Sequence, residues 1–180
     1  MKIYSARHGE TTRNAQNMIS GRTDVPLTER GRAQAAELAE LMSGRGIDLI
    51  IASPLIRAQD TARAIAEECG VRIVTDERLI EQDYGIYEGV RMSEPEFGDF
   101  LRNKRQFAYK YPGGESMMDV AHRVYGLFED IKRTYPDDAT ILLVSHGGVC
   151  RLINTYFHDM TNDEFYNYLP GNCSVEEYDL

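Results

Sequence analysis

Two histidines of this sequence share one local setting. His8 follows a short β-like run and precedes a glycine, and His146 follows another such run and precedes two glycines. A neutral imidazole is a competent nucleophile near pH 7. A helix that begins just after a histidine–glycine pair also brings free backbone N–H groups, which favour anions. The two histidines therefore suit chemistry on an anionic centre such as a phosphoryl group.

Arginines accompany both histidines. Arg7 adjoins His8, and Arg57 lies at the start of the helix predicted after residues 48–52. Guanidinium groups pair with phosphate oxygens and neutralise their charge. A leaving alkoxide also needs a proton, so a carboxylic acid should lie nearby. The residue pattern does not choose among the candidates, which are Glu10, Glu29, Asp60, Glu81 and Glu88.

The elements that must position these groups alternate between short apolar runs and longer helical patterns. Strands are predicted at residues 2–6, 48–52, 72–74, 140–144 and 173–179. Helices are predicted at residues 29–43, 54–69, 116–134 and 148–158. Thr28 and Ser116 are good N-caps, and Gly70 is a good C-terminal stop. An insertion of about residues 90–112, polar and aromatic over 93–111, is expected to be irregular or helical.

The order of these elements predicts the fold class. Strands that alternate with helices imply an α/β fold, with a largely parallel sheet covered by helices on both faces. Ligands bind such sheets outside the carboxyl ends of the strands, where His8 and His146 lie. The length of 180 residues fits a single domain spanning 1–180.

Composition limits the partners. The chain carries a net charge of −9, which argues against broad nucleic-acid binding because that requires a basic face. A few arginines in one cleft can still hold a phosphate on an acidic protein. No apolar run is long enough to cross a membrane, and charges at Arg7 and His8 come too early for a secretory leader, so we expect a cytoplasmic protein. The sequence does not indicate an oligomeric state.

The cysteines indicate neither a disulfide framework nor a zinc site. Cys69, Cys150 and Cys173 are scattered, and none belongs to a C-x-x-C pair. We expect no metal and no cofactor.

Six ordered segments resemble the motifs of the histidine phosphatase (phosphoglycerate-mutase-like) superfamily. Together they cover nearly the whole chain, which makes coincidence improbable. The segments are R-H-G-E-T at 7–11, the loop 21–31 ending in D-V-P-L-T-E-R-G, S-P-L-I-R-A-Q-D-T-A at 53–62, L-I-E-Q-D-Y-G at 79–85 with E-G at 88–89, P-G-G-E-S at 112–116, and S-H-G-G at 145–148.

This resemblance implies a fold and a set of roles. The fold is a three-layer α/β/α sandwich with a small helical insertion over the active site. His8 would be phosphorylated, and Glu81 would act as proton donor and then as base. The phosphoryl group would be held by Arg7, Arg57, Asn14 and His146, with backbone at Gly147, while Ser20 and Gly21 line the substrate side. The family's pattern also suggests that Glu88 sets a loop.

The superfamily contains phosphatases, mutases and members without activity. The short insertion favours a phosphatase over a cofactor-dependent phosphoglycerate mutase, because a mutase must shield its intermediate from water. A non-catalytic phospholigand-binding protein is disfavoured because no motif residue is missing. We therefore predict a metal-independent, acid-phosphatase-type phosphomonoesterase that acts on a small phosphorylated metabolite. The substrate stays open, and its rim candidates are Arg22, Arg91, Arg102, Lys104, Arg105, Tyr109, Lys110 and Tyr111.

Overall fold

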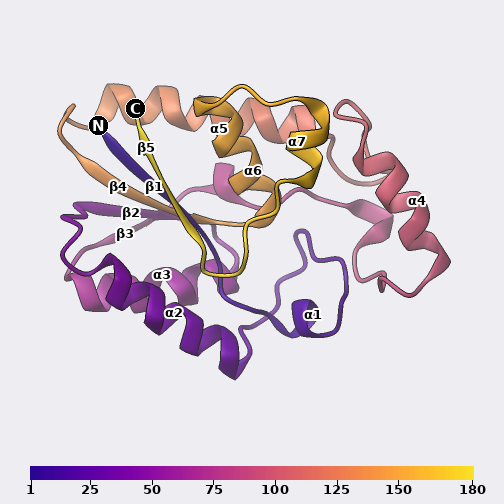
Figure 1. The fold of residues 1–180 in the computed structure, drawn as a ribbon, viewed down its shortest axis with the longest axis horizontal. Coiled ribbons are helices and arrows are strands. Elements are labelled where there is room, and N and C mark those ends of the chain that lie inside the picture. The colour runs from indigo at the N-terminus through magenta and orange to yellow at the C-terminus, as the bar shows by residue number, and fades with distance from the viewer.

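A five-stranded sheet in the order β3-β2-β4-β1-β5 forms the centre of the structure, a computed structural model that describes residues 1–180 (Figure 1). Strands β3, β2, β4 and β1 run parallel, and β5 pairs antiparallel with β1 at the edge. The predicted mostly parallel α/β sheet is confirmed. The strands are Lys2–Arg7 (β1), Leu49–Ala52 (β2), Ile73–Thr75 (β3), Thr140–Ser145 (β4) and Val175–Asp179 (β5).

Both faces of the sheet are buried because successive side chains point to opposite sides. On β1, Ile3 packs into the cluster of apolar side chains that includes α5 and α6, whereas Tyr4 packs into the cluster that includes α2 and α3. Ile141 and Leu142 divide in the same way on β4. An uninterrupted apolar run is therefore what a central parallel strand requires.

Helices cover both faces and complete the three layers (Figure 1). One face carries α2 (Glu29–Met42) and α3 (Ile56–Cys69), and the other carries α5 (Met117–Thr134) and α6 (Gly147–Phe157). These agree with the predicted helices to within two residues at each end. The chain contains no helix that is both long and apolar enough to cross a membrane.

Cap residues explain where these helices begin and end. Thr28 accepts a hydrogen bond from the Gly31 amide at the start of α2, and Ser116 forms a reciprocal capping box with Asp119 at the start of α5. Gly70 ends α3 with a φ of +70°, a conformation that favours glycine.

The insertion forms one helix on the side of the sheet where β1 and β4 end. This helix, α4 (Pro95–Lys104), lies apart from the three layers in Figure 1. Two short helices, α1 (Thr12–Ala15) and α7 (Asn162–Asn167), were not predicted. Each is too short to show a helical apolar period, although Thr11 and Thr161 cap them with their side chains.

Candidate active site

The sheet order brings His8 and His146 together. Strands β1 and β4 are neighbours whose last residues, Arg7 and Ser145, stand opposite each other in register. Each histidine directly follows its strand, and the His8 amide donates to the Ser145 carbonyl at 3.0 Å. The two imidazole rings consequently lie with their centroids 5.1 Å apart. The sequence alone does not predict that β1 and β4 are neighbours. Because they are, two histidines far apart in the chain lie side by side.

The surroundings of His8 favour one neutral form of its imidazole. Its Nδ1 lies 2.7 Å from the Gly9 carbonyl, which can only accept, so the proton sits on Nδ1 and the lone pair on Nε2. Burial lowers the pKa of His8 well below its usual value, and the positive charges of Arg57 and Arg7 lower it further. The imidazole therefore stays neutral at neutral pH, with the lone pair of Nε2 available.

His146 is fixed by contacts on both ring nitrogens. Arg57 donates from Nε to Nδ1 of His146 at 3.2 Å, which leaves the proton on Nε2, 2.7 Å from the Ser53 hydroxyl. His146 is fully buried, and burial together with Arg57 lowers its pKa well below the usual value. Ser53 and Arg57 reach it because they follow β2, the other neighbour of β4.

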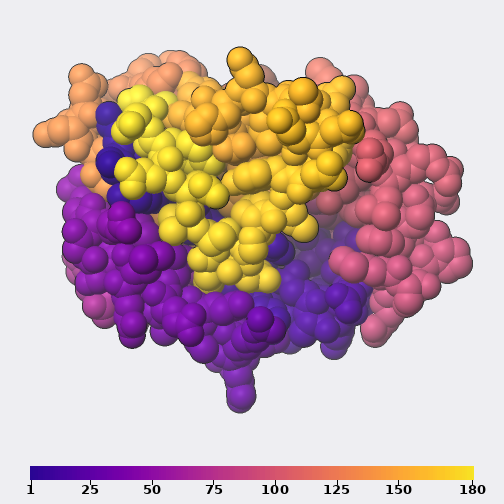
Figure 2. Space-filling model, in the orientation of Figure 1, coloured from indigo at the N-terminus to yellow at the C-terminus, as the bar shows by residue number.

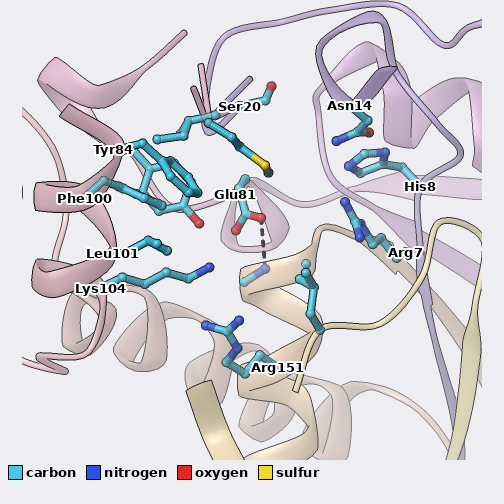
Figure 3. Close-up of a pocket in the computed structure, with 16 residues that line it drawn as sticks. Arg7, His8, Asn14, Ser20, Glu81, Tyr84, Phe100, Leu101, Lys104 and Arg151 are labelled. Atoms are coloured by element: carbon cyan, nitrogen blue, oxygen red, sulfur yellow. Dashed lines mark hydrogen bonds between the residues drawn. The ribbon is translucent and has the colours of Figure 1, made fainter. Parts of the chain in front are cut away.

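Four residues predicted to bind phosphate or substrate line the pocket, namely Arg7, Asn14, Ser20 and Gly147. Figure 3 shows Arg7 and Asn14 beside His8. The buried Nε of Arg7 and the buried hydroxyl of Ser20 have no partner within the chain. Asn14 uses its Oδ1 to accept from Thr11, which leaves its amide nitrogen as a donor. Gly147 is the first residue of α6, so its amide belongs to the free helix N-terminus. Such donors are complementary to phosphate oxygens.

Arg57 and Gly21 lie behind the pocket rather than on its wall. Arg57 is 1% exposed, and its two Nη groups donate to the Gly21 carbonyl at 2.6 Å and the Thr23 carbonyl at 3.0 Å. Arg57 thus ties the loop after Ser20 to His146. Its charge acts on His8 from beneath the site.

Glu81 lines the same pocket as His8. Its carboxylate is buried, and it accepts from the Gly148 amide at 2.9 Å and from the Gln82 amide at 2.9 Å. A side chain at Gly148 would put its Cβ 2.5 Å from the Glu81 Oε1, so the carboxylate would have to move. Glycine at position 148 therefore lets the Glu81 carboxylate stay in this position.

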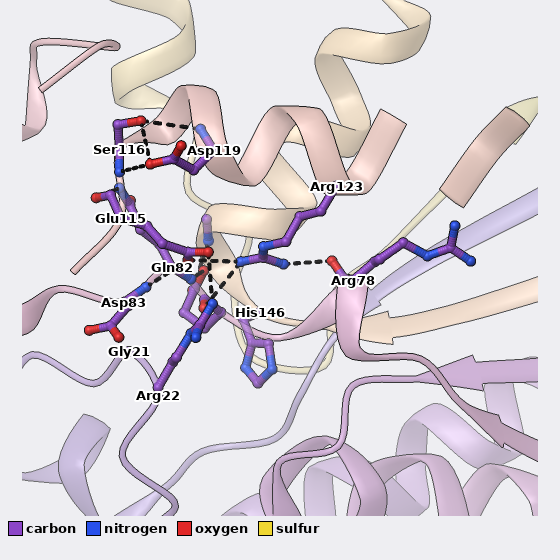
Figure 4. Close-up of polar contacts among 12 residues, drawn as sticks. Gly21, Arg22, Arg78, Gln82, Asp83, Glu115, Ser116, Asp119, Arg123 and His146 are labelled. Carbon is purple, nitrogen blue, oxygen red and sulfur yellow. Dashed lines mark hydrogen bonds and ion pairs between the residues drawn. The ribbon is translucent and has the colours of Figure 1, made fainter. Parts of the chain in front are cut away.

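Arg123 holds the backbone of the Glu81 segment (Figure 4). It donates to the Arg78 carbonyl at 2.6 Å and to the Glu81 carbonyl at 3.3 Å, and it pairs with the Glu115 carboxylate at 3.3 Å. Glu115 also accepts from the Asp83 amide at 3.1 Å. The P-G-G-E-S segment thus fixes the chain on both sides of the candidate acid.

Glu88 organises the loop that leads into the site. Its carboxylate accepts from the Gly21 amide at 3.2 Å, the Arg22 amide at 2.9 Å and the Thr23 hydroxyl at 2.7 Å. The prediction that Glu88 sets a loop is confirmed. A carboxylate suits this place because it presents only acceptors to several donors.

We expect Glu88→Gln to lower the free energy of unfolding by about 2 kcal/mol. The amide NH2 must face at least one N–H donor, which leaves a partly buried polar group without an acceptor. Urea unfolding would measure the loss. Glu37→Gln, on the exposed face of α2, is the matched control and should change stability by less than about 0.5 kcal/mol. Equal effects of the two substitutions would contradict the role given to Glu88.

Six of the predicted site residues border one pocket, whose empty volume is about 750 Å³ including the space open to solvent: Arg7, His8, Asn14, Ser20, Glu81 and Gly147. The predicted residues His146, Arg57 and Gly21 do not line it. In the space-filling view, the N-terminal loop, α4 and the C-terminal segment surround this hollow (Figure 2). The insertion therefore lies over the site, as predicted. Of the rim candidates only Lys104 lines the pocket. Pocket residues that the sequence analysis did not single out are Ile19, Tyr84, Met92, Phe97, Phe100, Leu101, Gly148, Arg151 and Leu169.

Comparison with known proteins agrees with this architecture. Residues 3–180 match the histidine phosphatase superfamily (branch 1). A protein named "Probable phosphoglycerate mutase GpmB" from Enterobacter sp. (strain 638) is 40% identical over 152 residues, which cover 82% of this chain and 70% of that protein. Its counterpart from Cronobacter sakazakii is 40% identical over 155 residues with the same coverage.

Solved structures share the whole fold. A mycobacterial glucosyl-3-phosphoglycerate phosphatase superposes with a TM-score of 0.90 at 30% identity, covering 98% of this chain and 91% of that one. Bacillus stearothermophilus YhfR gives a TM-score of 0.87 at 28% identity, covering 98% and 89%. With its sequence matched from residue 3 to the end and its two motif histidines side by side at the carboxyl ends of adjacent strands, the chain belongs to the histidine phosphatase superfamily.

Proposed function

We propose that the protein is a phosphomonoester hydrolase that works through a phosphohistidine on His8. The observation that carries this proposal is the fixed tautomer of His8. A proton held on Nδ1 by the Gly9 carbonyl leaves Nε2 as a nucleophile in a pocket lined by Arg7, Asn14 and Ser20. Nucleophile, anion-binding donors and a candidate acid then share one pocket.

The reaction takes place in two balanced steps. Nε2 of His8 forms a bond to phosphorus while the ester P–O bond breaks, and protonated Glu81 gives its proton to the departing alkoxide. Water then attacks the phosphohistidine and passes a proton to the Glu81 carboxylate as the P–N bond breaks. Inorganic phosphate leaves, and neutral His8 returns. Arg7 and the other pocket donors neutralise the charge on the transferred group.

The position of Glu81 supports its part in both steps. Figure 3 shows Glu81 in the middle of the pocket, between His8 and the side chains of Phe100 and Leu101, where it could serve the leaving oxygen and later the attacking water. The backbone of its segment is held by Arg123, so the carboxyl group is presented in one place. Proton transfer needs such positioning before it needs a matched pKa.

The relatives favour two different activities. The curated relatives given above are named as mutases, and the structural relative with a TM-score of 0.90 is named as a phosphatase. A mutase must keep its phosphorylated intermediate away from water, whereas a hydrolase must admit water. The pocket is partly open, and a single ten-residue helix, α4, lies over it. These features favour hydrolysis.

The proposal predicts phosphate release without positional transfer and without a metal. With 3-phosphoglycerate, chelator-treated protein should release inorganic phosphate faster than it forms 2-phosphoglycerate. It should also release phosphate from an alkyl phosphate, and added divalent ions should not raise either rate. Phosphate assays and 31P NMR would follow both products. Interconversion primed by 2,3-bisphosphoglycerate without phosphate release would favour the mutase. Binding without any turnover would favour a phospholigand-binding protein. Activity restored only by a metal would contradict the proposal that Arg7 and the other pocket donors alone neutralise the phosphoryl charge.

A further inference from the structure

The pocket contains more positive charge than one phosphoryl group requires. Its lining includes three cationic side chains, Arg7, Lys104 and Arg151, and a single carboxylate, that of Glu81. Arg57 adds a fourth cation just behind the wall. This concentration occurs in a chain whose net charge is −9. Arg7 and Arg57 lie beside His8, so Arg151 and Lys104 are left without an assigned partner.

Arg151 is a buried guanidinium with an unused donor. It comes from α6, one turn after Gly147 and Gly148, and is 1% exposed. Its Nε donates to the Tyr168 carbonyl at 2.9 Å, and its guanidinium stacks on Phe165 at 5.2 Å. Nη1 is buried with no partner, and no carboxylate pairs with the side chain. A buried cation that lacks a counter-ion is costly, so a ligand anion would complete the site.

Lys104 lies across the pocket at the end of α4. It is half-buried, forms no ion pair, and packs its ammonium group 5.7 Å from the centre of the Phe100 ring. Burial, together with the smaller effect of the Arg151 charge, lowers the pKa of Lys104 to about 8. An anion between them would offset both effects.

The remaining wall on this side is apolar. Figure 3 shows Arg7, His8 and Asn14 at one side of the pocket and Phe100, Leu101 and Lys104 at the other, with Arg151 directed toward Lys104. The apolar lining consists of Ile19, Tyr84, Met92, Phe97, Phe100, Leu101 and Leu169. A ligand that reaches from His8 to Lys104 must therefore cross an apolar surface.

We propose that Arg151 and Lys104 form a second anion-binding subsite, so that the substrate is a phosphomonoester with a carboxylate or a second phosphate at its far end and an apolar segment between. This inference rests on the proposed hydrolase function for the identity of the reacting end. The far anion would accept from the Arg151 guanidinium and Lys104 Nζ, while the apolar segment packs against α4. The phosphoryl end would meet His8.

Paired synthetic ligands test the subsite independently of turnover. Phosphonoalkanoates with two to six methylenes cannot be hydrolysed, and their carboxamide analogues differ only in the terminal charge. Calorimetry should give a Kd for the carboxylates that is about 10- to 100-fold lower than for the carboxamides at the best length, as expected for charge-assisted hydrogen bonds. The corresponding phosphate esters should show the same ratio in kcat/KM, and bisphosphates form a second arm that separates phosphate from carboxylate as the far anion.

Variants assign the preference to these residues. Lys104→Met and Arg151→Met should each reduce the carboxylate-to-carboxamide ratio to within about threefold of unity, with the carboxamide itself bound nearly as before. Arg102→Met is the matched control, because Arg102 is an exposed cation on the same helix that does not line the pocket and pairs with Asp99. It should leave the ratio unchanged. Lys104→Met decides the case if Arg151→Met does not fold.

The outcomes separate the two proposals. A preference for the charged ligand that disappears in Lys104→Met but not in Arg102→Met supports the subsite. The ligand series that binds more tightly, carboxylate or bisphosphate, identifies the far anion. Equal Kd values for charged and neutral analogues, or a preference that survives the pocket variants, overturn it. If the charged phosphonates bind preferentially but no ester releases phosphate, the subsite stands and the hydrolase function fails.

Discussion

Replacing His8 by alanine should abolish turnover and remove all covalent labelling by a 32P-labelled substrate. Loss of the nucleophile in a covalent mechanism costs about 10⁴-fold or more in rate, far beyond the loss of one anion donor. In the native protein, rapid acid-free quenching should trap label that is stable in base and lost in acid, as expected of a P–N bond. Because the His8 pKa is lowered by burial and by two arginines, labelling should persist somewhat below pH 6.5.

A matched histidine makes this test specific. His122 is exposed on α5 and takes no part in the pocket, so His122→Ala should label and turn over like the native protein. Label that is found on serine, cysteine or aspartate, or that persists in His8→Ala, would remove His8 from the mechanism. Circular dichroism of both variants would separate chemistry from folding.

Glu81→Gln should slow phosphorylation of His8 by alkyl phosphates by about 10²–10⁴-fold, the range that general acid catalysis supplies. An alkoxide is a poor leaving group without a proton, whereas nitrophenolate departs easily without one. The same variant should therefore lose much less rate with nitrophenyl phosphate. The amide must also face the donors of Gly148 and Gln82, so some local disturbance is expected with both substrates.

The comparison must be made on the first step alone. Glu81 also serves the proposed hydrolysis of the intermediate, so steady-state rates would mix its two roles. Burst or single-turnover measurements isolate formation of the phosphohistidine. Any structural disturbance in Glu81→Gln affects both substrates, so it cancels when the two rate losses are compared. Equal losses with the two leaving groups would show that Glu81 places charge rather than donating a proton.

Much of the fold could be predicted because its elements are long or strongly patterned. The apolar runs that became β1, β2 and β4 and the capped helices α2, α3 and α5 carry their signals within the sequence. Helices α1 and α7 hold only four and six residues, too few to show a period. The antiparallel direction of β5 could not be predicted either, because it depends on which strand β5 pairs with in the folded sheet.

The site divides along the same line. His8, Arg7 and Glu81 could be proposed because their chemistry or their motif marks them, and the structure places all three on one pocket. Lys104 was only one of several rim candidates, since a helix in an insertion gives no hint of the face it turns inward. Arg151 was missed, although a lone charge within the apolar run of α6 was a usable signal.

The burial of the two histidines links the active site to the acid stability of the whole protein. Both His8 and His146 have pKa values well below the usual 6.5 because they are buried, so each takes up a proton when the chain unfolds in mildly acidic solution. Their contribution is fully present above pH 6.5 and is lost as pH falls toward the folded pKa values. Below pH 6.5 the free energy of unfolding should fall by up to about 1.4 kcal/mol per pH unit for each histidine. Chemical denaturation between pH 7 and 5 should show this slope, and His8→Gln should remove about half of it. The burial that keeps His8 and His146 neutral therefore means that unfolding in mildly acidic solution consumes protons.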